Sequence, residues 1–234
     1  MKIKEVIASL ESLAPPALQE GYDNAGLITG DENIECKGIL ISLDATETVI
    51  DEAISKSCNM VVSHHPIIFS GLKKITGKNY VQKAVIKAIK NDIALYAIHT
   101  NLDNVLNGVN GKIAGRLDLK NVSVLAPKEN QLKKLFTFVP VNDADKVRQA
   151  IFDAGGGHIG NYEECSFNAD GFGTFKGDSN TNPYVGKPGE LHRENELKVE
   201  VIFPAWLEGR IIKNLIAAHP YEEVQGTRKW SPGP

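Results

Sequence analysis

Five side chains able to bind metal follow the ends of three apolar runs in this chain. They are Asp44, the pair His64 and His65, and the pair His99 and Asp103. Imidazole and carboxylate together bind Zn²⁺, Fe²⁺, Mn²⁺ or Co²⁺, and without a neighbouring cysteine a closed thiolate site is disfavoured. If two metals are bound, one histidine could serve each and Asp103 could bridge them. Metals about 3.5–4 Å apart would polarise a substrate oxygen and lower the pKa of a bridging water.

The adjacent histidines can share one site only where their strand has ended, because neighbouring side chains in a strand point to opposite faces. Pro66 supports such an end, since it keeps His65 out of the helical region and cannot donate to a sheet ladder. A lone His-His pair is usually a coincidence or a structural pair, but the second set at His99 and Asp103 favours a metal site. Asp44 either accepts a hydrogen bond from a histidine or simply begins the next helix.

The elements that must position these residues alternate along the first 126 residues. The spacing of apolar residues and the capping signals predict helices at Ile3–Leu13, Thr46–Ser57 and Tyr80–Lys90. Short apolar runs predict strands at Gly38–Leu43, Met60–Val62 and Ile93–Ile98. This alternation predicts an α/β fold: a mostly parallel sheet with helices on both faces, and a ligand site at the carboxyl ends of the strands.

The pattern changes after the polar, proline-containing segment Leu125–Gln131. The later part predicts a strand at Leu135–Val139, a helix at Asp143–Ala154, a hairpin of Tyr162–Asn168 with Gly173–Lys176 around Ala169-Asp170-Gly171, a strand at Leu197–Phe203 and a helix at Ala205–Ala218. The order β-α-β-β-α predicts an α+β, ferredoxin-like unit that lacks its last strand.

Composition excludes several classes of protein. The chain has 234 residues, 42% of them hydrophobic, with a net charge of −3 and no basic half, so neither membrane insertion nor nucleic-acid binding is supported. The lysines around Tyr80–Lys90 are best interpreted as a solvated helix face. The three cysteines lie far apart, and the N-terminus has no apolar core of a secretory signal. We therefore expect a cytoplasmic protein.

Four segments stand out together: DNAGL (Asp23–Leu27), SLDAT (Ser42–Thr46), VVSHHPIIF (Val61–Phe69) and AIHTNLD (Ala97–Asp103). Their order and spacing resemble the NIF-three-like metalloproteins, which include the GTP cyclohydrolase 1 type 2 homologs. Two later segments, GHIGNYEECSF (Gly157–Phe167) and AHPYEEV (Ala217–Val224), are similar to the PII-like or CutA-like domain inserted in many bacterial members. The corresponding domains here would be 1–126 and 131–226, with an irregular tail at 227–234.

The resemblance implies a site for two divalent ions per subunit (Zn, Fe or Mn) and a toroidal homohexamer. His64, His65 and Asp103 match metal ligands, and His99, close by, is the candidate catalytic proton-transfer group. Family members with this insert run on past it and supply a further His and Glu, whereas this sequence stops at Pro234 and its segment Gln225–Pro234 resembles no closing strand. We therefore expect an incomplete two-metal site and apolar sheet surface exposed in the first domain.

Three functions follow as hypotheses. The first is a metal-dependent hydrolase acting on a nucleotide-like or phosphorylated small molecule. The second is a non-catalytic, metal-binding oligomer that scaffolds or regulates partners, and the third, nucleic-acid binding, is the weakest. Outside the first domain, His219 and Glu223 stand four residues apart, but Pro220 lies between them, so a structural turn is favoured over a metal pair.

Overall fold

A computed structural model describes residues 1–229 of the chain. The chain divides into two compact units, Met1–Leu125 and Ala126–Pro234. Within the described residues, no helix is long and apolar enough to cross a bilayer.

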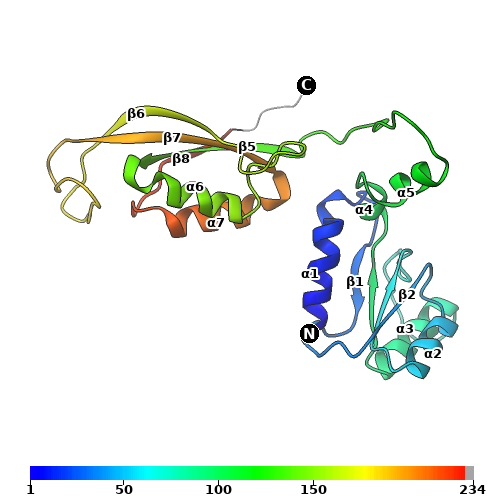
Figure 1. The fold of residues 1–234 in the computed structure, drawn as a ribbon. Helices are drawn as coiled ribbons and strands as arrows, with labels where there is room; N and C mark the ends of the chain where they lie inside the picture. Colours follow the sequence, from blue (N-terminus) through cyan, green and yellow to red (C-terminus); the bar gives the residue numbers. More distant parts are fainter. Residues whose placement is uncertain (230–234) are drawn as a thin grey trace. The chain divides into compact units, whose positions relative to one another are not determined.

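The first unit is built on a four-stranded sheet in the order β1-β4-β3-β2 (Figure 1). Its strands are β1 (Gly26–Thr29), β2 (Ile39–Ser42), β3 (Met60–Ser63) and β4 (Ala94–Ala97). The strands β2, β3 and β4 are parallel, and β1 runs antiparallel to β4. The predicted mostly parallel sheet is thus confirmed. The half-buried strand β1, which begins within the DNAGL segment at Gly26 and ends at Thr29, was not predicted.

Helices cover both faces of this sheet (Figure 1). On one face lies α1 (Ile3–Leu13), and on the other lie α2 (Glu47–Ser55) and α3 (Tyr80–Lys90) (Figure 1). The short helices α4 (Thr100–Asp103) and α5 (Val109–Arg116) follow β4 along the chain. Alternation along β3 decides the packing: Met60 and Val62 pack with α1, whereas Val61 packs with α2 and α3. Thr46 caps α2 by accepting a hydrogen bond from the Val49 N–H.

Tyr96 of β4 offers a direct test of how this core is packed. Its side chain is buried against α1, and its hydroxyl has no hydrogen-bond partner among the described residues. Burial, and secondarily Glu11, raise the pKa of Tyr96 to about 12. A buried hydroxyl without a partner is destabilising, so we expect Tyr96→Phe to keep or raise the free energy of unfolding, by up to about 1 kcal/mol. Urea unfolding measures this, and a loss above about 1 kcal/mol would show that the hydroxyl is bonded.

The β2 strand leaves apolar side chains exposed on the first unit. It is the last strand of the sheet, and its residue Ile41 is 79% exposed. Leu43, which directly follows the strand, is 61% exposed. The expected exposed apolar sheet surface is therefore present, and it lies at β2.

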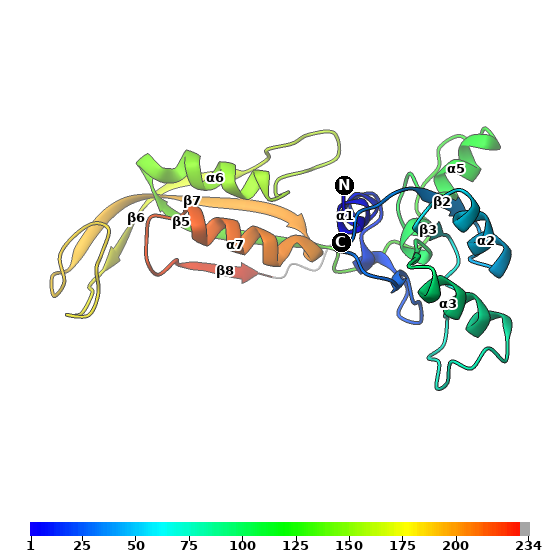
Figure 2. The same ribbon diagram turned by 90° about the horizontal axis from the view of Figure 1, so that it is seen from below.

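The second unit has the element order β-α-β-β-α-β. Its elements are β5 (Leu132–Pro140), α6 (Ala144–Asp153), β6 (Phe167–Phe175), β7 (His192–Pro204), α7 (Glu208–Ala218) and β8 (Gly226–Lys229). The sheet order is β6-β7-β5-β8, and every neighbouring pair is antiparallel. The helices α6 and α7 lie side by side on one face of the sheet, with Val147, Ile151 and Ile211 in the core that they form with β5 and β7 (Figure 2).

Two predictions for the second unit are wrong. The hairpin around Ala169-Asp170-Gly171 does not form, because Gly171 does not adopt the positive φ that such a turn requires. Instead β6 runs straight through Asp170, which pairs with Leu197 of β7. The prediction of an irregular tail at 227–234 is also partly wrong, because β8 pairs with β5 from Gly226 onward and supplies the last strand. Residues 230–234 of the predicted tail lie outside the described residues.

Candidate metal centre

The parallel register brings the polar strand ends to one edge of the first sheet. Ser42 pairs with Ser63, and Ser63 pairs with Ala97, so the three strands end level with one another. The residues that stand two positions beyond these ends are Asp44, His65 and His99. The spacing along the sequence therefore places these three polar side chains at the same edge of the sheet, as the parallel arrangement predicts.

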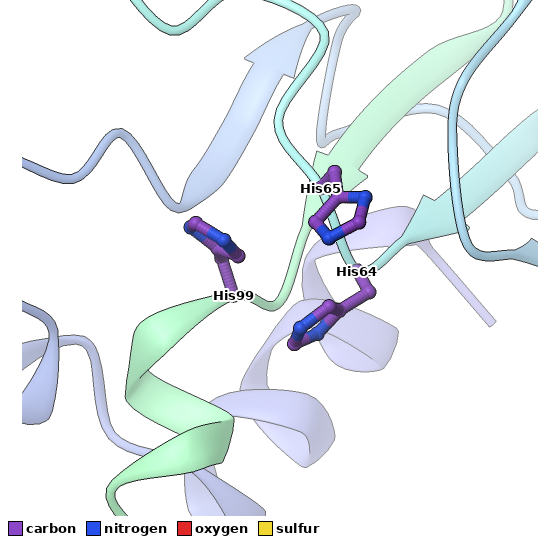
Figure 3. A group of neighbouring side chains, drawn as sticks. All are labelled: His64, His65 and His99. Carbon is purple, nitrogen blue, oxygen red and sulfur yellow. The ribbon is translucent and has the colours of Figure 1, made fainter. Parts of the chain in front are cut away.

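His64, His65 and His99 form one compact group at this edge (Figure 3). Their ring centroids lie 5.0 Å apart for His64 and His65, 5.2 Å for His64 and His99, and 5.6 Å for His65 and His99. One ring nitrogen from each lies within 4.8 Å of the others. Three imidazole nitrogens at this spacing are a donor set suited to a transition-metal ion.

The Nδ1 atom of every ring in this group is held by an oxygen of the protein. The acceptors are the Ile98 carbonyl for His64 at 2.9 Å, Asp44 Oδ1 for His65 at 2.8 Å, and Asp23 Oδ1 for His99 at 2.8 Å. A carbonyl or carboxylate oxygen can only accept, so in the neutral form of each ring Nδ1 carries the proton and Nε2 has the lone pair. Metal-binding histidines are oriented in this way by their outer hydrogen bonds.

Asp23 is the most firmly bound of these acceptors. Its side chain is 0% exposed, and its second oxygen accepts hydrogen bonds from the backbone N–H, at 3.0 Å, and the hydroxyl of Thr100. Burial raises the pKa of Asp23, but the hydrogen bonds from Thr100, His99 and Asn24 outweigh it and lower the pKa below its usual value. Asp23 is therefore an ionised acceptor that fixes the ring of His99.

Asp44 holds His65 in a more open setting. The two side chains are 56% and 47% exposed. Of the two roles that the sequence left open for Asp44, the structure shows the hydrogen bond to a histidine, and Thr46 rather than Asp44 caps the helix. Water can therefore reach the group from the side of His65.

Asp103 lies beside this group and is not one of its three members. Its Oδ1 is 3.8 Å from Nε2 of His64, and it stands at the end of α4, a four-residue helix that begins directly after His99. The sequence assigned Asp103 to the metal and His99 to proton transfer. The structure places His99 with His64 and His65, and the individual roles of His99 and Asp103 stay predictions.

His219 belongs to a structural turn in the second unit. Its Nε2 donates to the Phe138 carbonyl at 3.0 Å, and its Nδ1 accepts from the Tyr221 N–H at 3.1 Å. Burial lowers the pKa of His219 against the opposing effect of that carbonyl. Both ring nitrogens are occupied by backbone groups, so no lone pair is left for a metal shared with Glu223.

Sequence reasoning missed the role of Asp23. The residue lies 76 positions before His99, and no periodicity connects them. The signal that could have found it is the DNAGL segment, which matched the family motif but carried no assigned function.

A mostly parallel α/β sheet with three convergent histidines at its carboxyl edge defines a class of protein suited to metal binding. Comparison with known sequences refines this class: the profile of the Duf34/NIF3 family (NGG1p interacting factor 3) matches residues 1–181. The chain belongs to the DUF34/NIF3 family, and the resemblance read from its motifs is confirmed.

Curated relatives carry the name GTP cyclohydrolase 1 type 2 homolog. The one from Halalkalibacterium halodurans is 43% identical over 219 residues, which cover 93% of this chain and 59% of the relative. The one from Bacillus subtilis is 40% identical over 222 residues, covering 94% and 60%. The chain thus spans about 60% of the length of these relatives.

Two solved structures are similar to this chain over nearly its whole length. A Bacillus cereus protein related to NIF3 has a TM-score of 0.84 and 42% identity, covering 100% of this chain and 63% of that one. The Staphylococcus aureus protein SA1388 has a TM-score of 0.65 and 31% identity, covering 97% and 59%.

Proposed function

We propose that the first unit binds divalent metal through His64, His65 and His99 and serves a metal-dependent hydrolase of a nucleotide-like or phosphorylated small molecule. The observation that carries the proposal is that all three rings have Nδ1 held by an oxygen, which leaves three Nε2 atoms as ligands. The cyclohydrolase name of the relatives supports a nucleotide-like substrate.

Zn, Fe or Mn fits this donor set, because imidazole suits Zn and Fe and a carboxylate adds affinity for Mn. If two ions bind per subunit, Asp103 would supply a carboxylate beside the histidines, since its Oδ1 lies 3.8 Å from Nε2 of His64. When bound, the metal would supply a Lewis acid that polarises a phosphoryl or carbonyl oxygen and acidifies water.

The residues around the three histidines have different roles in this proposal. Asp23 and the Ile98 carbonyl hold two of the rings in fixed orientations. His65, with its partner Asp44, stands at the open side, where a substrate can approach. His99 has the ionised carboxylate of Asp23 at its Nδ1, and this carboxylate would stabilise a proton on the ring of His99.

The proposal also covers the second unit, the oligomeric state and the partners of the protein. The second unit has the element order of a ferredoxin-like fold, and we assign it to the PII-like or CutA-like insert of the family. The protein is a cytoplasmic homohexamer that acts on a small molecule, and neither membranes nor nucleic acids are its partners.

Turnover by the purified full chain tests this function. Elemental analysis should find Zn, Fe or Mn, and the chain should release product from GTP or p-nitrophenyl phosphate. Chelation by EDTA should abolish the activity, and added metal should restore it. His65→Ala should lose both metal and activity, whereas His158→Ala, an exposed histidine of the second unit, should lose neither. Bound metal without turnover of any substrate would favour the non-catalytic scaffold or regulator instead.

A further inference from the structure

The second unit contains a cavity that the metal centre does not involve. Its volume is about 450 Å³, which lies in the range of small-molecule sites. It is bordered by β5, β6, β7, the loop after β6 and the turn after α7. The residues used below are Phe175, Tyr184, Glu196 and Tyr221, together with the charged residues at the rim.

Aromatic rings form one wall of this cavity. The ring of Tyr221 lies 6.0 Å from that of Phe175 and 6.4 Å from that of Tyr184, at interplanar angles of 61° and 57°. Phe138 of β5 adds a further ring to the lining. Rings set at such angles present faces as well as edges, and an aromatic face attracts a cation through the ring quadrupole.

A buried carboxylate faces the same space. Glu196 of β7 is 7% exposed, and its Oε1 accepts a hydrogen bond of 2.7 Å from the hydroxyl of Tyr221. Burial, followed by this hydrogen bond, raises the pKa of Tyr221, so the hydroxyl remains a donor. Among residues 1–226, whose side chains the structure describes, no lysine, arginine or histidine forms an ion pair with Glu196. A buried carboxylate without a cation is costly.

Gly173 on β6 has no side chain, and this leaves the space that the Glu196 carboxylate occupies. A Cβ atom at Gly173 would come within 2.3 Å of Oε2 of Glu196. Any larger residue would push the carboxylate out of its place. Gly173 therefore has a packing role, which is to let the Glu196 carboxylate lie against β6.

The charged residues that line the cavity favour a positively charged ligand. Its lining holds four acids and one base, and these are Asp178, Glu196, Glu222, Glu223 and Lys176. A phosphate or nucleotide would meet a net negative surface there. The metal-competent group among the described residues is the one in the first unit, and the aromatic wall offers a metal ion no ligand. Aromatic faces with a buried carboxylate instead match an organic cation.

We propose that this cavity binds a small organic cation, an ammonium or guanidinium compound, whose charge lies between Glu196 and the rings of Tyr221 and Phe175. The proposal is independent of the metal centre and of the proposed hydrolase activity.

Matched pairs of probes test the charge directly on the full chain. Choline is compared by calorimetric titration with its neutral isostere 3,3-dimethylbutan-1-ol, and butylguanidine is compared with butylurea. We expect at least one cation to bind tenfold or more tighter than its neutral partner, and ATP not to compete. If both cations bind no better than their neutral partners, or if ATP displaces them, the proposal is overturned.

Variants locate the binding. Glu196→Gln keeps the volume and the acceptor for the Tyr221 hydroxyl but removes the charge, so it should weaken cation binding tenfold or more. Glu190→Gln, which makes the same charge change at an exposed loop position, should leave binding unchanged, and so should His65→Ala. Equal weakening by Glu190→Gln would overturn the assignment. Circular dichroism checks the fold of each variant, and the matched probes decide the matter on the unchanged chain if Glu196→Gln does not fold.

Discussion

Replacing His99 with alanine should lower the affinity of the chain for Zn²⁺ by a hundredfold or more. His99 is one of three imidazoles whose nitrogens lie within 4.8 Å of one another, and its loss removes a direct ligand. Changing a residue that merely orients a ligand costs about 10–100-fold in affinity, so removing a ligand itself should cost at least as much. Competition with a chromophoric chelator measures the affinity.

His158→Ala is the matched control for this experiment. His158 is an exposed histidine in the second unit, so its loss should change the affinity less than threefold. An affinity within threefold of the unchanged chain for His99→Ala would mean that His99 is not a ligand. Loss of turnover with full retention of metal would then return His99 to the role of a proton-transfer group.

Replacing Asp23 with alanine should weaken metal binding 10–100-fold and also destabilise the first unit by about 3 kcal/mol or more. The change leaves the Nδ1–H of His99 and both donors of Thr100 without their acceptor. Buried donors without partners account for the lost stability, and a freely rotating His99 ring accounts for the lost affinity. Urea unfolding and the chelator competition measure the two effects separately.

Two further variants separate positioning from general stability. Asp23→Asn keeps an oxygen that can accept from His99, so part of the metal affinity should return. Asp44→Ala removes the equivalent acceptor of His65 from a site where both side chains are about half exposed, so it should cost less than about 1 kcal/mol of stability. If Asp23→Ala binds metal as tightly as the unchanged chain does, the ring of His99 is not fixed by Asp23.

The sheet of the first unit could be predicted from the sequence because local patterns there agree with tertiary contacts. The helices Ile3–Leu13 and Tyr80–Lys90 have the predicted bounds, since each presents one apolar face to the sheet. The convergence of His64, His65 and His99 followed from strand ends alone, because parallel strands in register end at one edge.

The remaining features depend on contacts that a linear pattern does not contain. The β6 strand continues through an Asp-Gly pair because its pairing with β7 outweighs the local turn preference. The short strand β8 has no apolar run of its own, and it forms against β5. Asp23 reaches His99 across 76 residues, so its role becomes visible only when the fold brings the two together.

A crystal structure of the full chain grown with Zn²⁺, with anomalous data collected at the zinc edge, tests the central claim most directly. The three Nδ1 hydrogen bonds predict an anomalous peak coordinated by the Nε2 atoms of His64, His65 and His99, at about 2.0–2.1 Å from each. Zinc bound through an Nδ1 atom, or zinc bound elsewhere on the chain with these three rings free of it, would contradict the account.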